Sequence, residues 1–371
     1  MIFIILIASF LALARSSLAY NPRPCIGFKV PVEVQANNSI YDIPRVDSNV
    51  DAVDLVRNLV VWSGPNATSR ITAPRPVHQT FSISARLCVP DGGAKASILQ
   101  IATHDTNSYV NAALKAGYSI LIYDRLGVGQ SDKPDAYEIL QAPLEVEILH
   151  QLTILARSGQ LVPSPLTSKN VQLPKFDKIV LVGHSFGTAI TSGAISKYGD
   201  TIDGAVLTAF VYNKEFLATG VDSYGWEHAP ESDHKRFSEF PSGVIVQGTV
   251  SSVQQIFMKK GAFEPDMLDY AEEVKQPAGV GELLSVGMIW PLPAPAFSGP
   301  LLIALAEFDF PVCRGDCKGV VDLSTLGPGL WPKASDISLQ IHPNSGHGLT
   351  LHRNSTGHFQ VVFSYLNEKG L

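Results

Sequence analysis

The sequence predicts an α/β fold with a mostly parallel central sheet, and two observations lead to this prediction. Short apolar runs alternate with helical patterns through the middle of the chain, as they do in proteins built from βαβ units. These runs are apolar at nearly every position, which is typical of strands that have helices on both faces of their sheet. The predicted strands are residues 97–102, 118–124, 178–183, 204–208 and 300–306.

Helical patterns lie between these strands. Pro143 suits the first turn of a helix over residues 143–158, in which Leu and Ile recur at helical spacing. Similar segments predict helices at residues 109–116 and 186–197. Each predicted helix separates two predicted strands, which is the arrangement that a parallel sheet requires.

Two parts of the chain depart from this alternation. Before residue 95, an alternating pattern at residues 80–89 and a Pro-rich connection at residues 72–76 predict antiparallel strands that lead into the parallel sheet. Residues 213–298 lack a regular alternation and lie between two core strands, so we expect an inserted cap there. The predicted organisation is therefore a core of residues 20–212 and 299–371 that carries this cap.

The first 19 residues resemble a signal peptide. Residues 2–13 form an apolar run that is shorter than the roughly 20 residues needed to span a bilayer. Ser17 and Ala19 follow it in the small-x-small pattern of a cleavage site. Because no Lys or Arg precedes the run, an uncleaved membrane anchor is the alternative. No later stretch is long and apolar enough to span a membrane, so we expect a secreted mature protein without stable membrane insertion.

The four cysteines agree with export. Cys313 and Cys317 lie close together in a Gly-containing loop and could close a tight ring, which would leave Cys25 and Cys88 to tie the N-terminal strand to a neighbour. Four cysteines allow three pairings in principle. Four buried free thiols are the alternative, but an oxidising compartment disfavours it.

Three N-x-S/T sequons also agree with export. They place candidate glycosylation sites at Asn37, Asn66 and Asn354 if the chain passes through a eukaryotic secretory pathway.

Composition limits the class of protein. The 371 residues are 45% hydrophobic and 17% charged, which is enough apolar material to bury a sizeable core and unlike a disordered chain. The formal net charge is −6 and no Lys/Arg-rich block occurs, so nucleic acid is not an expected partner.

The main chemical motif is the G-x-S-x-G pentapeptide of residues 183–187. It follows a predicted strand directly and precedes a helix rich in small residues, so Ser185 is expected on a sharp strand-to-helix turn that projects its hydroxyl. The helix N-terminus also places amide N–H groups near any negative charge that develops there. An ordinary turn that happens to contain Ser is the alternative reading.

A serine nucleophile needs a base and an acid that orients the base. Asp309 follows the predicted strand 300–306, and His347 lies in a Gly-flanked loop after a candidate strand at residues 337–341. The chain order Ser, Asp, His, with each residue at a strand end, predicts a catalytic triad of Ser185, Asp309 and His347. The rival residues are His342 and His352 for the base, the latter expected to begin the final helix, and Asp316 and Glu307 for the acid.

A resemblance to a known superfamily rests on these motifs and on a second one. Residues 123–131 (YDRLGVGQS) resemble the Y-D-x-x-G-x-G-x-S turn of α/β-hydrolases. Residues 141–145 and the cysteine-containing loop 309–317 resemble a narrower group of secreted fungal serine hydrolases. The resemblance covers most of the chain from about residue 80 and is weakest in the cap. It implies an α/β-hydrolase fold with an inserted cap, an ester, lactone or similar acyl substrate, and no metal or cofactor.

One departure from the superfamily concerns the oxyanion hole. The N–H of Phe186 is one expected donor, but the other donor usually comes from a His-Gly loop after an early strand. Here His104 is followed by Asp105, and the loop looks short. A backbone donor at Asp105 is therefore doubtful, and a rebuilt loop, a lost segment or weak activity would each explain the difference.

We expect from these features a secreted serine hydrolase that cleaves a small-molecule acyl bond through an acyl-enzyme. The alternative is an acyl transferase or a catalytically weak binding protein of the same fold. Cap aromatics such as Tyr224, Trp226 and Trp290 either line an apolar substrate pocket or pack the cap against the core.

Overall fold

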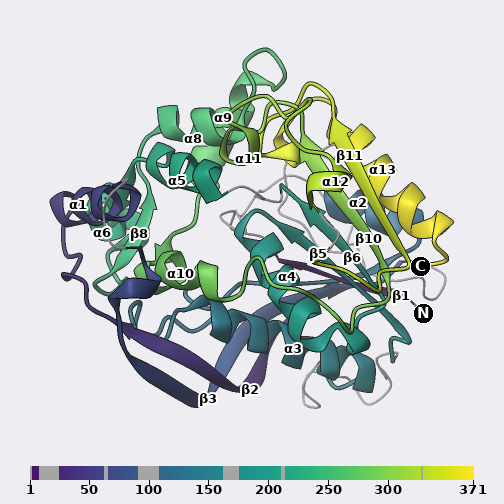
Figure 1. Ribbon diagram of the computed structural model, residues 1–371, viewed down its shortest axis with the longest axis horizontal. Coiled ribbons are helices and arrows are strands. Elements are labelled where there is room, and N and C mark those ends of the chain that lie inside the picture. Colours follow the sequence, from purple (N-terminus) through teal and green to yellow (C-terminus); the bar gives the residue numbers. More distant parts are fainter. Residues whose placement is uncertain are drawn as a thin grey trace.

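The computed structural model of the chain is shown in Figure 1. It describes residues 2–7, 25–61, 66–90, 108–161, 175–209, 214–326 and 329–371. The predicted strand 97–102 and the doubtful oxyanion residue Asp105 lie outside the described residues.

Eight described strands form one sheet in the order β11-β10-β6-β5-β1-β4-β3-β2. The pairs from β11 to β4 are all parallel, whereas β3 pairs antiparallel with both β4 and β2. This sheet confirms the predicted α/β class with antiparallel strands leading into it. The strands are β1 (Ile2–Ile7), β2 (Cys25–Tyr41), β3 (Ile71–Cys88), β4 (Ser119–Tyr123), β5 (Lys178–His184), β6 (Gly204–Thr208), β10 (Pro300–Ala306) and β11 (Asp336–His342).

Helices cover both faces of the sheet, and this explains why the strands are apolar throughout. In β5, Ile179 and Leu181 join a hydrophobic cluster with residues of α3 (Ala142–Ser158) and α4 (Phe186–Tyr198). Val180 and Val182 point to the other face and join a second cluster with residues of α2 (Tyr109–Ala116) and α13 (Ser355–Glu368). Successive side chains of a strand point to opposite faces, so both sets must be apolar. The three predicted helices α2, α3 and α4 are confirmed within one residue at each end.

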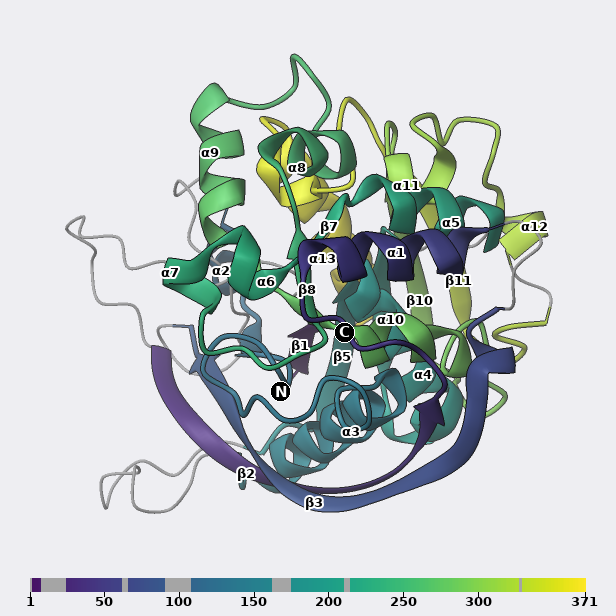
Figure 2. The ribbon, with the colours of Figure 1, turned by 90° about the vertical axis from the view of Figure 1, so that its left-hand side faces the viewer.

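The long pair of β2 and β3 departs from the prediction. The Pro-rich segment 72–76 was expected as a connection, but it lies within β3, and this expectation is wrong. Pro74 and Pro76 are exposed and oppose Ser39 and Asn37 of β2, whereas β4 pairs only with residues 85–88 at the far end of β3. Proline has no N–H to donate, so it is tolerated in a strand where that side of the backbone has no neighbouring strand to pair with. Figure 2 shows the pair curving beneath α3.

The apolar run at the N-terminus has a specific place in the structure. Residues 2–7 form β1, which pairs with β4 on one side and β5 on the other in the middle of the sheet. The sequence predicts the same residues to belong to a signal peptide. A segment that is removed by cleavage cannot also supply a central strand of the mature protein.

The chain between β6 and β10, the predicted cap, forms a unit to the left and upper left of the sheet in Figure 1. Many of its residues form a third hydrophobic cluster with α1 (Asn49–Val60), whereas others, such as Phe237, Val244 and Trp290, belong to the first cluster. The sequence did not predict α1, which buries only Ala52, Leu55 and Val56. The unit contains α5 (Lys214–Ser223), β7 (Trp226–His228), α6 (Ala229–Ser232), α7 (His234–Phe237), β8 (Val244–Gln247), α8 (Val250–Phe257), α9 (Pro265–Val274), β9 (Ala278–Gly279) and α10 (Val280–Ser285).

Two short helices follow β10, namely α11 (Phe310–Cys313) and α12 (Leu323–Leu326). Single 3-10 turns lie at Thr68–Arg70, Gly199–Thr201, Val286–Met288 and Leu349–Leu351. Within the described ranges, every helix is too short or too polar to cross a membrane.

Candidate active site

Ser185 lies at a tight turn between β5 and α4. Its backbone has φ 55° and ψ −119°, a strained conformation for a residue with a side chain. A Cβ atom on Gly183 would lie only 2.4 Å from the carbonyl oxygen of Gly187, so the first glycine of the pentapeptide is required for the turn to close. The predicted strand-turn-helix context of the motif is therefore present.

The structure brings Ser185, His347 and Asp309 into one hydrogen-bonded relay. His347 Nε2 lies 2.8 Å from Ser185 Oγ, and His347 Nδ1 lies 2.9 Å from each carboxylate oxygen of Asp309. An ionised carboxylate only accepts hydrogen bonds, so Nδ1 carries the proton in the neutral ring. Nε2 is then an acceptor, and it is placed to take the proton of the Ser185 hydroxyl.

Burial differs along the relay in a way that suits its chemistry. Asp309 and His347 are fully buried, whereas Ser185 is partly exposed. His184 lies against His347 with 5.1 Å between the ring centroids, and burial lowers the pKa of His184 well below its usual value, with a further contribution from His347. His184 therefore stays neutral, and it does not oppose the positive charge that His347 gains when it accepts a proton.

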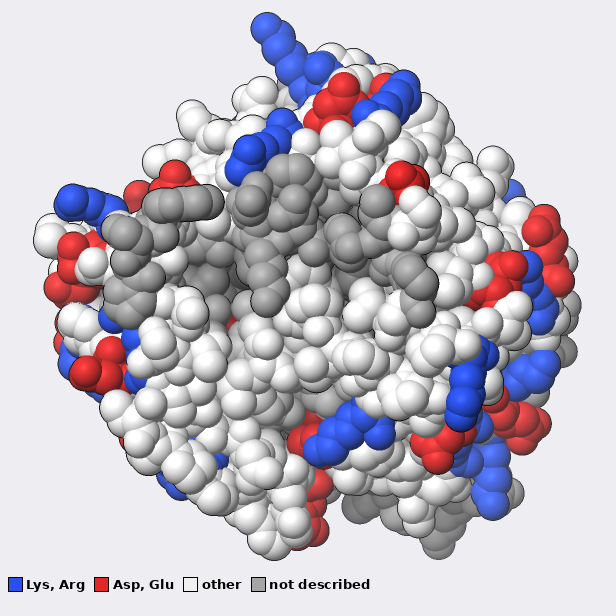
Figure 3. All heavy atoms as spheres, viewed as in Figure 1, with Lys and Arg blue, Asp and Glu red and all other residues white. Residues whose placement is uncertain are grey.

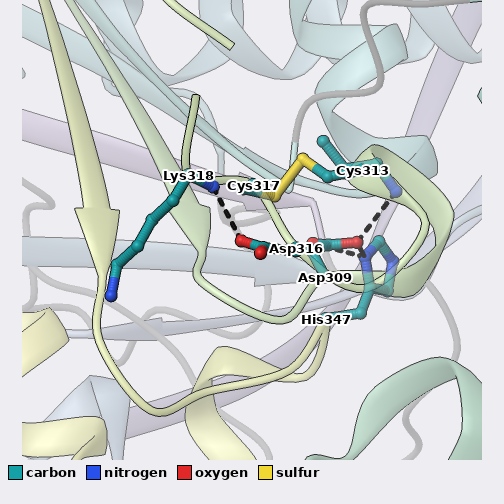
Figure 4. The surroundings of a disulfide bond; sticks show 7 residues. Asp309, Cys313, Asp316, Cys317, Lys318 and His347 are labelled. Carbon is teal, nitrogen blue, oxygen red and sulfur yellow. Dashed lines mark hydrogen bonds and ion pairs between the residues drawn. A yellow bond between two sulfur atoms is a disulfide. The ribbon is translucent and has the colours of Figure 1, made fainter. Parts of the chain in front are cut away.

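The disulfide between Cys313 and Cys317 holds the loop of the acid (Figure 4). Asp309 caps α11, because its side chain accepts a hydrogen bond of 3.0 Å from the Val312 amide. Its carbonyl oxygen accepts from the amides of Cys313 and Gly315, both at 3.1 Å. The small ring closed by the disulfide thus folds back on the backbone of Asp309 and limits how the carboxylate can move.

The loop of His347 packs against the cap. The amide of Gly348 donates to the carbonyl of Phe257 at 2.9 Å, and a Cβ on Gly346 would lie 2.9 Å from the same oxygen. The flanking glycines therefore allow close contact with the cap backbone at the end of α8. The Phe257 ring also lies 5.5 Å from the His347 ring, so the cap helps to position the imidazole.

The rival residues have structural roles. His352 is fully buried outside the final helix, accepts hydrogen bonds of 3.0 Å from the amides of Gly346 and Lys259, and donates to the carbonyl of Gly348. It lies three residues before α13, so the expectation that it begins that helix is wrong. Burial lowers its pKa to about 4, which keeps the ring neutral and able to hold this loop. His342 is bonded to the carbonyl of Asn354.

The rival acids Asp316 and Glu307 are hydrogen-bonded to residues outside the relay. Asp316 accepts a hydrogen bond from the Lys318 amide (Figure 4), and Glu307 accepts from the amide of Asn344 and pairs with the Lys318 side chain. These hydrogen bonds hold the pKa of Glu307 below its usual value, with the Lys318 contact as the largest cause. Glu307 thereby ties the loop of the acid to the loop of His347.

A cavity of about 120 Å³ opens beside Ser185. Two polar lining residues are already bonded within the protein: Thr188 donates to the carbonyl of Thr208, and Glu282 pairs with Arg125. The remaining surface is mostly apolar. Its apolar and aromatic residues are Phe186, Ala189, Val221, Tyr224, Trp226, Ala278, Leu283, Val286, Trp290 and Pro311. The cap aromatics Tyr224, Trp226 and Trp290 therefore line the pocket and also belong to the hydrophobic clusters.

The profile of the Alpha/beta hydrolase family matches residues 87–355. The chain belongs to the alpha/beta hydrolase family. No curated protein sequence matches it. Structurally similar proteins include a thermophilic esterase from Thermogutta terrifontis (13% identity, 78% of this chain and 94% of the esterase, TM-score 0.49). A bromoperoxidase from Bacillus anthracis is also similar (17% identity, 78% of this chain and 95% of the peroxidase, TM-score 0.44).

One donor for an oxyanion lies at the position expected for an alpha/beta hydrolase. Phe186 is the first residue of α4, so its amide has no acceptor within the helix and lies next to Ser185. The other predicted donor, at Asp105, lies outside the described residues.

A buried ion pair lies behind this hydrolase site. Arg125 is fully buried, pairs with Glu282, and lies with its guanidinium carbon 4.9 Å from the ring centre of Phe186. Glu145 lies on the same guanidinium at 3.9 Å, and burial raises its pKa to about 8. Glu145 is therefore mostly protonated at neutral pH, which leaves one positive and one negative charge in the cluster.

Figure 3 shows that the charged residues on this face of the hydrolase mix both signs around its margin.

Proposed function

We propose that the chain is a serine hydrolase that cleaves a carboxylic ester, a lactone or a related acyl bond of a small molecule. The observation that carries the proposal is the complete relay from Asp309 through His347 to Ser185, which ends at the floor of an apolar cavity. Membership of the alpha/beta hydrolase family supports hydrolase activity in general.

The geometry suggests how the reaction would proceed. Ser185 Oγ attacks the acyl carbon while its proton passes to His347 Nε2, and Asp309 stabilises the resulting imidazolium. The electrons of the carbonyl bond move to its oxygen, where the Phe186 amide can donate a hydrogen bond. The intermediate expels the alcohol, which takes the proton from His347. Water then attacks the acyl-enzyme by the same route and releases the acid.

The cavity favours a short or compact acyl group. Its volume of about 120 Å³ is somewhat below the roughly 150 Å³ of an engineered apolar cavity that holds benzene. We therefore propose a short aliphatic or single-ring acyl group, with the leaving group directed toward solvent.

A fluorophosphonate probe tests the nucleophile without knowledge of the substrate. We expect stoichiometric labelling at Ser185, located by peptide mass spectrometry, and complete loss of labelling in Ser185→Ala. A panel of acetyl, butyryl, benzoyl and palmitoyl esters should then show faster turnover for the shorter chains. A folded wild-type protein that remains unlabelled would contradict the proposal. Product analysis with added alcohol separates hydrolysis from the alternative of acyl transfer.

We propose in addition that the protein is exported. The leader-like N-terminus, the three sequons and the cysteine pairs support this proposal. Asn37, Asn66 and Asn354 are all exposed, and the structure joins Cys25 to Cys88 and Cys313 to Cys317. Cleavage after Ala19 would remove β1 and leave β4 and β5 with unpaired inner edges, which is costly. The segment 97–102, predicted as a buried strand from the sequence, lies outside the described residues.

Truncation tests this proposal directly. If the leader is removed in the mature protein, a chain that begins at Tyr20 should fold, react with the probe at Ser185, and have the thermal midpoint of the secreted protein. Expression of the full chain in a eukaryotic secretory host should yield the same N-terminus by mass spectrometry. If residues 2–7 are instead a permanent strand, the truncated chain will aggregate and the full chain will retain its leader.

A further inference from the structure

We propose that Tyr224 is a catalytic hydrogen-bond donor, whose hydroxyl stabilises the oxyanion formed when Ser185 attacks an acyl group. This inference rests on the proposed hydrolase function and adds to it a residue from the cap. Tyr224 follows α5 and precedes β7, far in the chain from all three members of the relay.

The direction of the hydrogen bond follows from the relay. The hydroxyl of Tyr224 is hydrogen-bonded to the side chain of Ser185. The proton of Ser185 is already directed to His347 Nε2, which is the acceptor nitrogen of the ring. Ser185 Oγ can therefore only accept from Tyr224, so Tyr224 donates to the oxygen that carries out the attack.

Packing holds the Tyr224 ring in this position. It stacks on Trp226 with 4.7 Å between the centroids and 4° between the planes, and the edge of Phe257 meets it at 6.3 Å. Trp226 is itself anchored, because its indole N–H donates to the carbonyl of Val221 at 2.9 Å. Tyr224 is only 8% exposed and lines the same cavity as Ser185 and Phe186. A donor fixed in this way needs little reorganisation during the reaction.

The environment also keeps the hydroxyl protonated. Burial is the largest cause and raises the pKa of Tyr224 above its usual value; the hydrogen bond with Ser185 acts against this, and the charge of Asp309 adds to it. The group therefore remains a neutral donor at neutral pH.

The reaction changes what Tyr224 can bind. When Ser185 Oγ bonds to the acyl carbon and passes its proton to His347, the carbonyl oxygen gains the electron pair of the broken π bond. This oxygen lies two bonds from Oγ, so a small shift carries the Tyr224 hydrogen bond from Oγ to the new oxyanion. Tyr224 transfers no proton, and it would act beside the amide of Phe186 as a second donor. The hydrogen bond is stronger to the charged oxygen than to the neutral hydroxyl.

The variant Tyr224→Phe tests the proposal, because it keeps the stacked ring and removes only the hydroxyl. We expect kcat to fall between about 100-fold and 1,000-fold, as for loss of one oxyanion donor, with KM changed by less than about threefold. Affinity for an alkyl trifluoromethyl ketone, which forms an oxyanion adduct with serine, should fall by the same factor as kcat/KM. Tyr270→Phe in α9 is the matched control, since Tyr270 packs in the cap cluster and does not line the cavity, and it should behave like the wild type.

Failure of this inference is distinct from failure of the proposed function. If the wild type turns over esters and Tyr224→Phe matches it within twofold, or changes only KM, the donor role is wrong while the hydrolase proposal stands. The rate of fluorophosphonate labelling gives a second comparison that needs no substrate, and it should also fall in Tyr224→Phe. A wild type that is neither labelled nor active would overturn both proposals.

Discussion

Replacing Asp309 with Asn is expected to lower kcat about 10⁴-fold while leaving the fold intact. Both oxygens of Asp309 accept from His347 Nδ1, and this contact selects the tautomer with a free Nε2. An amide nitrogen at this position donates to Nδ1 instead and moves the ring proton to Nε2, which then cannot accept from Ser185. The same change in a serine protease lowers kcat by about 10⁴. Steady-state kinetics on a short-chain ester measures the effect.

Folding should survive this substitution, because Asn caps a helix about as well as Asp does, and α11 would keep its cap. Asp316→Asn is the matched control, since Asp316 lies in the same loop and its side chain accepts from the Lys318 amide. We expect its kcat to stay within about twofold of the wild type. Equal losses in the two variants would mean that the loop as a whole, and not the orienting carboxylate, determines activity.

Replacing Arg125 with Met is expected to lower the free energy of unfolding by about 3–5 kcal/mol. Arg125 is fully buried and is the cation of the cluster formed with Glu282 and Glu145. Its removal leaves the charge of Glu282 without a counterion away from water, although the side chains are similar in length. Urea unfolding followed by circular dichroism measures the loss.

Glu145→Gln serves as the control for this experiment. Burial keeps Glu145 mostly protonated at pH 7, with its pKa raised to about 8, so an uncharged amide of the same shape replaces an uncharged acid. We expect this variant to unfold at the same or a higher urea concentration than the wild type. If Arg125→Met lowers the free energy of unfolding by less than about 1 kcal/mol, water must solvate the charge of Glu282 or Glu282 must take up a proton.

Several elements could be predicted closely because their signal is local. The bounds of β6, β10 and α2 agree with the predicted ranges at both ends, since strands covered on both faces must be apolar at each position and α2 lies between two of them. The helix α1 was missed because only one narrow side of it is buried. The prolines of residues 72–76 were misread because their place in β3 depends on pairing with a strand more than 30 residues earlier in the chain.

The sequence by itself determined the strand-turn-helix around Ser185, the order of the triad candidates and the cysteine pairing that was favoured. It favoured Asp309 and His347 by their order in the chain, but rival histidines and acids lie at or after the ends of the same two strands, β10 and β11. Tertiary structure decided that choice: His352 is bonded into its own loop, Glu307 joins two loops, and Asp309 and His347 meet beside the serine. It also brought Tyr224 to the same hydroxyl. The physical reason is that backbone turns depend on neighbouring residues, whereas hydrogen bonds between distant side chains depend on how the sheet and the cap bring their loops together.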